Sequence, residues 1–107
     1  MTKLPDHFIK FQESHPRVFA SYEALGQAAS AEGPLSKKEV SLVKLATAAG
    51  AGLEGAVHAH CRRALEAGCS ADEIRHAVIL GVTTLGFPSM MANLCRVDEI
   101  IARHNQS

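Results

Sequence analysis

The sequence has few aromatic residues, no tryptophan and no net charge, and each absence narrows the possible classes of protein. Aromatic residues make up 5% of the 107 residues. The core must therefore be built mainly from small aliphatic side chains, which favours close packing of helices. Eleven basic and eleven acidic residues give a formal net charge of zero. Nucleic acids and anionic membranes are normally bound by a basic face, so we expect neither as a partner.

Long apolar runs are also missing. No stretch approaches the roughly 18 apolar residues of a transmembrane helix. At the N-terminus, Asp6 and His7 precede any apolar run, which is unlike a signal peptide. We therefore expect a cytoplasmic protein, and at this length a single domain over residues 1–107, in which residues 1–34 are a helical lead-in.

Cysteines are few and show no motif. Cys61, Cys69 and Cys95 make an odd count without CxxC spacing, which argues against a disulfide framework and against a structural zinc site. We expect three free thiols. Nothing in the sequence implies a metal or an organic cofactor.

Helix signals occur along the whole chain, and no segment shows the alternation of a strand. Residues 36–39 and 70–73 are two capping boxes, in which a serine and a glutamate can satisfy free backbone N–H groups at a helix start. Breaks are expected at His15–Pro16, at residues 32–34 and at residues 86–88. The fold class predicted is an all-α domain of five or six helices.

The helix expected after the second capping box is unusually apolar. It should run through Leu85, and from Ala77 to Val82 it is apolar on all sides, which is typical of a helix buried on every side. A domain of this size has little material to cover such a helix. We therefore expect it to be buried between subunits of a homo-oligomer.

Residues 53–68 form the helix that carries the functional candidates. At about 100° per residue, His60 shares an apolar face with Val57, whereas His58 lies about 200° from His60 and is expected to face water. An imidazole titrates near neutrality, and a partly apolar pocket can tune it. His60 is therefore a candidate general acid or base. The alternative is a core histidine whose ring is hydrogen-bonded to a backbone carbonyl.

The cysteines and charged residues each have two interpretations. Cys61, next to His60, could be a nucleophile or a sensor thiol, or simply a small buried hydrophobe. Cys69 lies between two predicted helices and could be exposed, and Cys95 is assigned to the apolar face of the last helix. Two sets of charged residues are expected on solvated faces: Glu54, His58 and Arg62, and then Arg96, Asp98, Glu99 and Arg103.

Four segments together resemble the carboxymuconolactone decarboxylase and alkylhydroperoxidase D-like proteins. They are Leu35–Glu39, Glu54-Gly55 leading into His60, Ala64–Ile74 and Gly86–Pro88. The similarity covers residues 35–102. It implies a compact helical protomer that assembles into a dimer, trimer or hexamer, with active sites near subunit contacts.

The resemblance is closer to the non-redox branch of that family. The redox branch carries a CxxCxxxH element, with a glutamate twelve residues before the first cysteine. If His60 is the family histidine, the two cysteines fall on Leu53 and Ala56, and the glutamate falls on Ser41. A dithiol peroxidase needs a reactive thiolate and a resolving thiol. The resemblance therefore implies no peroxidase of the CxxC type.

The resemblance thus implies a decarboxylase-like lyase that moves a proton on a small organic acid. In this hypothesis His60 transfers the proton in an apolar pocket. The residues expected to exclude water from it are Leu53, Val57 and Phe87. Two alternatives stay open. One is a peroxiredoxin-like antioxidant oxidoreductase that uses a relocated thiol, Cys61 or Cys69, and the other is a non-catalytic oligomer that binds a ligand.

Overall fold

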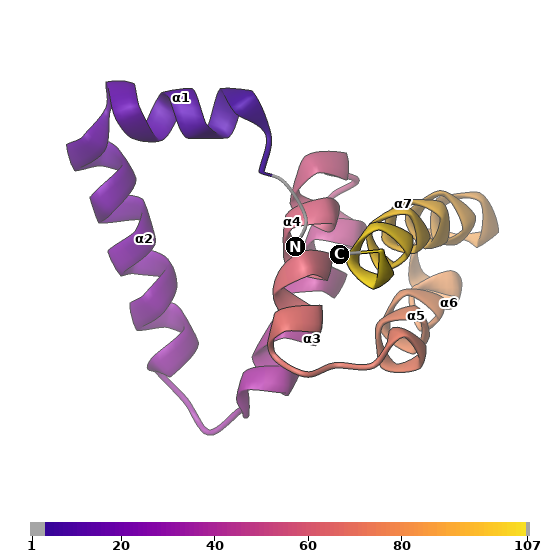
Figure 1. The fold of residues 1–107 in the computed structure, drawn as a ribbon. Helices are drawn as coiled ribbons and strands as arrows, with labels where there is room; N and C mark the ends of the chain where they lie inside the picture. Colours follow the sequence, from indigo (N-terminus) through magenta and orange to yellow (C-terminus); the bar gives the residue numbers. More distant parts are fainter. Residues whose placement is uncertain (1–3, 107) are drawn as a thin grey trace. The chain divides into compact units, whose positions relative to one another are not determined.

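The described part of the protein is entirely helical, as predicted (Figure 1). The structure is a computed structural model that describes residues 4–106. Its helices are α1 (Asp6–Ser14), α2 (Pro16–Ala31), α3 (Lys37–Gly50), α4 (Glu54–Glu66), α5 (Ala71–Ile79), α6 (Val82–Leu85) and α7 (Phe87–Asn105). All except the single turn α6 have nine residues or more. The chain divides into two compact units that meet in sequence at Pro34 and Leu35, and each is described by itself.

The N-terminal unit consists of α1 and α2, separated at the predicted proline break. His15 ends α1 and Pro16 is the first residue of α2, where the missing proline N–H costs no hydrogen bond. The rings of Phe8 and Phe19 meet edge to face, with centroids 5.4 Å apart. Neither of these two described helices contains a buried residue, so this unit has no core of its own.

In the second unit, α3 and α5 begin at the two predicted capping boxes. Ser36 Oγ accepts a hydrogen bond from the Glu39 backbone N–H at 3.1 Å, and the Ser36 N–H donates to Glu39 Oε1 at 2.8 Å. Ser70 and Glu73 repeat this arrangement at 3.0 and 2.8 Å. Both boxes satisfy backbone donors that the first helical turn would otherwise leave free.

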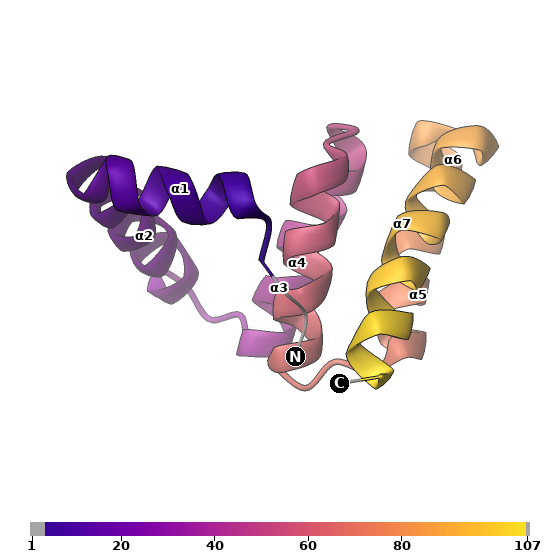
Figure 2. The same ribbon diagram turned by 45° about the horizontal axis from the view of Figure 1, so that its top comes forward.

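The core of the second unit forms where α4 packs against both α3 and α7 and α7 packs against α5 (Figure 2). Its largest fully buried side chains are Leu45, Val57, Cys61, Ile74, Val97 and Ile100. Burying each Leu, Ile or Val side chain contributes about 1.5–3 kcal/mol. None of the helices within residues 4–106 combines the length and apolar character needed to cross a membrane.

The prediction of one continuous helix from residue 70 to residue 85 is wrong. The helix α5 ends at Ile79, and α6 starts afresh at Val82 after a turn at Leu80 and Gly81. A Cβ at Gly81 would lie 3.2 Å from both the Val78 carbonyl oxygen and a Leu85 methyl group, so this turn favours glycine. Ile79 and Leu80 are 44% and 65% exposed. Within the protomer, the segment is therefore not buried on every side.

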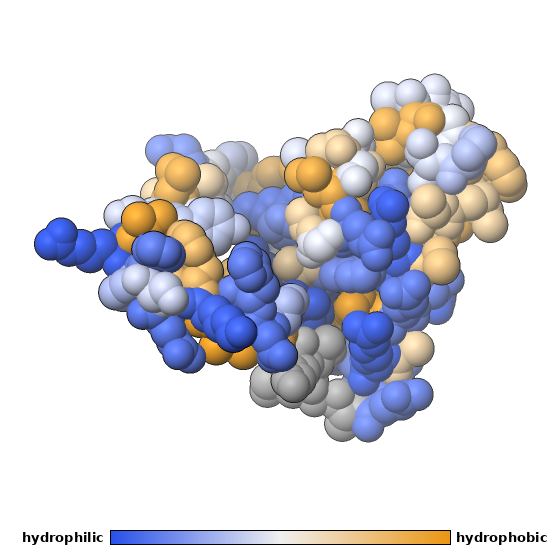
Figure 3. All heavy atoms as spheres, turned by 90° about the horizontal axis from the view of Figure 1, so that it is seen from above, coloured by the Kyte–Doolittle hydropathy of each residue, from blue (hydrophilic) through white to orange (hydrophobic). Residues whose placement is uncertain are grey.

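Other apolar side chains also lie at the surface. Figure 3 shows apolar atoms at the end of the molecule where α6 meets α7, and Phe87 and Met91 at the start of α7 are exposed. Isolated surface hydrophobes are common, but several close together in sequence and on adjoining helices indicate a contact surface.

Candidate functional site

His60 lies on the side of α4 that faces α3, and its imidazole is half-buried. Burial lowers the pKa of His60 below its usual value near 6.5, and the positive charges of Arg63 and of Lys44 on α3 lower it further. Each effect disfavours the protonated ring. The His60 imidazole is therefore neutral at neutral pH, which is the form that can accept a proton.

The three residues expected to exclude water from His60 have different environments. Val57 is one helical turn before His60 and is completely buried in the core. Leu53, just before α4, is 57% exposed, and Phe87, at the start of α7, is 63% exposed. A wall that includes Leu53 and Phe87 therefore excludes water only if another surface covers them.

A groove of about 520 Å³ lies between α3 and the segment formed by α5 and α6. Its lining is apolar except for Glu73 and His76, both from α5. None of the predicted site residues lines it. Leu42 of α3 is in its wall, and Lys44 lies about 200° further round that helix. The groove and His60 are therefore on different faces of α3.

The prediction that His58 faces water is wrong. Its side chain is 19% exposed, and its Nε2 atom lies 3.6 Å from Oε2 of Glu99 on α7. That nitrogen is buried, and within residues 4–106 it has no hydrogen-bond partner. The helical wheel of α4 misplaced His58 because α4 is covered on two flanks, by α3 beside His60 and by α7 beside His58.

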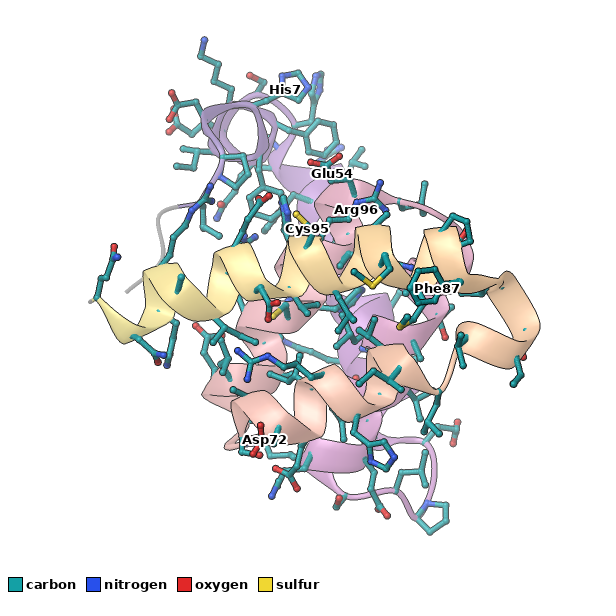
Figure 4. All side chains as sticks on the ribbon, turned by 90° about the vertical axis from the view of Figure 1, so that its right-hand side faces the viewer. His7, Glu54, Asp72, Phe87, Cys95 and Arg96 are labelled. Atoms are coloured by element: carbon teal, nitrogen blue, oxygen red, sulfur yellow. The ribbon has the colours of Figure 1, made fainter. Side chains whose placement is uncertain are left out.

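Three polar residues of α7, Asn93, Arg96 and Glu99, form a polar seam on the flank of α4 that α7 covers. Asn93 is buried and donates from Nδ2 to the Ala49 carbonyl at 3.3 Å, while its Oδ1 accepts from Arg96 at 3.1 Å. Arg96 Nε also lies 3.9 Å from Glu54 Oε1, and Figure 4 shows these two side chains next to each other beside Cys95. Arg96 was assigned to a solvated face, and this assignment is wrong. Asn93, Arg96 and Glu99 are spaced three residues apart, which places them along one face of α7. This spacing is the feature of the sequence that could have predicted the seam.

The cysteines are free, as predicted, but two of them lie in unexpected environments. Cys61 is fully buried and its thiol donates to the Val97 carbonyl at 3.7 Å. Burial raises the pKa of Cys61 to about 12, which argues against a reactive thiol. Cys69, expected to be exposed, is buried with its thiol 3.7 Å from the Lys38 carbonyl, and burial raises its pKa. Cys95, assigned to an apolar face, is exposed.

A protein metal site needs several ligands that lie close together. Among the residues that the structure describes, no group of three or more His, Cys, Asp or Glu side chains is placed to hold a metal ion.

The helix order defines an all-helical protein with a half-buried histidine in α4 and glycines at positive φ in the turns after α3, α4 and α6. Comparison with known families is more specific, because the model of the carboxymuconolactone decarboxylase family matches residues 16–99. The chain belongs to the carboxymuconolactone decarboxylase family. This confirms the resemblance found in the sequence, and the match extends further towards the N-terminus, through α2.

One solved structure supports the fold independently. It is the apo form of a carboxymuconolactone decarboxylase family protein from Legionella pneumophila, with 23% sequence identity and a TM-score of 0.77. The similarity covers 90% of this chain and 86% of that one. No curated protein sequence gives a significant match.

Proposed function

We propose that the protein is an enzyme of the carboxymuconolactone decarboxylase type that moves a proton on a small organic acid, with His60 as the acid–base group. The observation that carries this proposal is the environment of His60, in which burial and two nearby cations keep the imidazole neutral. A neutral imidazole can accept a proton at the pH of the cell. Its half-buried position leaves the ring partly open to a ligand.

The charges around His60 favour an anionic substrate. Lys44 and Arg63 both act on His60 as positive charges, and a carboxylate placed among them would gain Coulomb energy in a partly desolvated site. The bound carboxylate would at the same time favour protonated His60. A substrate acid would therefore convert His60 from a base into a proton donor.

This exchange of roles fits the loss of carbon dioxide from an acid whose carboxyl group lies β to a carbonyl. The bond between carbon and carboxylate breaks, and its electron pair moves into the enolate of the carbonyl. Carbon dioxide leaves, and protonated His60 then gives its proton to the same carbon. Decarboxylation without a metal or an organic cofactor requires such an electron sink in the substrate itself.

We also propose that a second copy of the chain covers the exposed apolar surface of the second unit. Ile79, Leu80 and Phe87 are large, apolar and exposed, and Leu80 also lines the apolar groove. Burying such residues is what drives subunit association. An assembly of two to six copies would supply the surface that Leu53 and Phe87 need in order to exclude water.

The direct test is exchange of solvent deuterium into candidate acids, including carboxylated lactones and β-keto acids, followed by proton NMR. The variant His60→Gln keeps a polar side chain of similar size but cannot shuttle a proton. We expect it to lose at least about 100-fold in rate, the lower end of general acid–base contributions. His104→Gln, on α7, is the matched control and should keep the wild-type rate. Equal turnover by His60→Gln and wild type would rule out this role for His60.

A non-catalytic role is the second candidate, and the groove is the observation that favours it. A volume of about 520 Å³ lies within the range of small-molecule sites. An acid that binds tightly without exchange or turnover would point to this role. Peroxiredoxin-like chemistry at Cys61 or Cys69 is not favoured, since both thiols are buried and hydrogen-bonded to backbone carbonyls.

A further inference from the structure

The N-terminal unit carries an exposed apolar stripe on α2. Val18, Tyr22 and Leu25 follow one another at four- and three-residue spacing, so they lie on one face of this helix. Each of these side chains is more than half exposed. The contact between α1 and α2 uses a different face, where Phe19 meets Phe8. Such a stripe is typical of a helix that docks in an apolar groove.

The groove between α3 and the segment formed by α5 and α6 is a matching apolar surface of the second unit. All its lining residues belong to that unit. Two of them, Val43 and Leu80, are more than half exposed. The polar residues of the lining, Glu73 and His76, both come from α5. The groove is therefore polar towards the start of α5 and apolar towards its end.

Polar and apolar residues follow the same order along α2. Arg17, just before the stripe, is exposed, and every residue of α2 after Leu25 is uncharged. In the groove, Glu73 Oε1 binds Lys38 at 3.2 Å and accepts from the Ser70 N–H at 2.8 Å, which leaves Oε2 for another cation. A helix laid parallel to α5 would place Arg17 at this carboxylate and Leu25 at the apolar end of the groove.

We propose that α2 of a second copy of the chain occupies this groove, parallel to α5. Arg17 of the second copy pairs with Glu73, and its Leu25 packs on Leu80. The family match begins at residue 16, so α2 belongs to the family domain although it lies outside the unit that holds the groove. The inference rests on the proposed assembly and names the helix through which the copies associate.

The short link between α2 and α3 favours a second copy over the same chain. The first turn of α3 lies beside Glu73, because Lys38 pairs with that carboxylate. If α2 of the same chain placed Arg17 at Glu73 and ran parallel to α5, its last residue would lie about 21 Å further along. Residues 32–36 span about 20 Å only when fully extended, and the chain bends at residues 32–34. A second copy can present α2 in this direction without stretching the link.

Disulfide cross-linking between two separately prepared proteins tests the inference. One carries Leu25→Cys and the other Leu80→Cys, and both carry Cys95→Ser to remove the exposed native thiol. The two proteins are incubated together until subunits exchange and are then mildly oxidised. We expect a disulfide between positions 25 and 80 to form at least about tenfold faster than one between two molecules of either protein, because docking raises the local thiol concentration. Intact mass and peptide mapping identify the product.

Gln27→Cys replaces Leu25→Cys in the matched control. Position 27 lies about 200° from position 25 around α2, so it should not cross-link to position 80 above background. A single chain with both Leu25→Cys and Leu80→Cys distinguishes the possible occupants, and we expect it to form disulfide-linked dimers. An intramolecular disulfide would show that α2 of the same chain fills the groove. Faster joining of two Leu80→Cys proteins would show that two grooves face each other, and either result overturns the inference.

Arg17→Glu tests the direction of the docked helix. A glutamate in the first turn suits the helix dipole, so the substitution does not weaken α2 itself. We expect it to slow the cross-linking of positions 25 and 80 at least about fivefold, the effect of losing an ion pair at the edge of an interface. Lys10→Glu, on α1, makes the same change of charge and should leave the rate unchanged. Equal rates with and without Arg17→Glu would contradict the proposed direction of α2.

Sedimentation separates this inference from the assembly on which it rests. An oligomeric wild type whose variants give no cross-link between positions 25 and 80 contradicts the α2 contact alone. A monomeric wild type contradicts the α2 contact and the proposed assembly together. Circular dichroism of each variant controls for loss of fold. These outcomes do not depend on whether His60 is catalytic.

Discussion

At the scale of single residues, the two histidines of α4 show how the surroundings of a side chain determine its chemistry. His60 and His58 are two positions apart; His60 is half-buried, and His58 is mostly buried. His60 faces the cation Lys44 on α3, whereas His58 faces the carboxylate Glu99 on α7. One helix thus presents an imidazole suited to accept a proton and another suited to hold a carboxylate.

The lowered pKa of His60 predicts how stability changes with pH. The unfolded chain binds a proton at His60 near pH 6.5, and the folded protein binds it only at lower pH. The unfolded state therefore gains protons first on acidification, and the free energy of unfolding falls as the pH drops below about 6.5. Once the pH is below the folded pKa as well, this contribution stops changing.

Urea denaturation of wild type and His60→Gln between pH 8 and pH 5 checks this direction. We expect the free energy of unfolding of the variant to fall less over that range, because glutamine takes up no proton. The comparison at pH 8, where His60 is neutral in both states, gives the cost of the substitution itself. Equal slopes for the two proteins would show that the pKa of His60 is the same in the folded and unfolded states.

At the scale of helices, the two capping boxes stabilise the starts of α3 and α5, as the sequence predicted. We expect Ser36→Ala to lower the free energy of unfolding by about 1 kcal/mol, because the Glu39 N–H loses its acceptor at the start of α3. Thermal or urea denaturation measures the change. Ser36→Asp keeps an oxygen at the cap and should retain most of the stability, whereas a loss as large as that of Ser36→Ala would show that the cap is not the cause.

Features that depend on neighbours in sequence were predictable, and features that depend on distant segments were not. The helix starts at Ser36 and Ser70 and the break at Pro16 follow from local hydrogen bonding and proline geometry, and the structure agrees. The environment of His58 depends on α7, some forty residues later, which a helical wheel does not include. The inert state of Cys61 and Cys69 likewise depends on packing against other segments.

At the scale of the whole molecule, the exposed apolar residues connect fold and function. The sequence predicted that the segment from Ala77 to Val82 would be buried, and within the protomer Ile79 and Leu80 remain exposed. Burial of these residues by other subunits stays a prediction, and it is part of the proposed assembly. Membership in the carboxymuconolactone decarboxylase family was recognisable from the capping boxes and glycine-containing turns of the sequence, and the family match confirms it.

The variant Leu80→Glu tests the assembly. A charge at this exposed position costs the protomer little, but burying it in an apolar interface without a partner costs several kcal/mol. We expect wild type to sediment as an oligomer and Leu80→Glu to sediment as a smaller species with the same circular dichroism. Glu32→Gln, in the link between α2 and α3, is a surface control that should not dissociate. A monomeric wild type would contradict the proposed assembly.

The central claim is that His60 is a neutral base whose pKa an acidic ligand can raise. Long-range proton–nitrogen NMR of the six histidine rings, with His60→Gln to assign the signal, measures it directly across a pH titration, with and without a small carboxylic acid that binds. We predict that the His60 pKa lies below that of free histidine and rises when the acid is present. An ordinary pKa that the acid leaves unchanged would contradict the account.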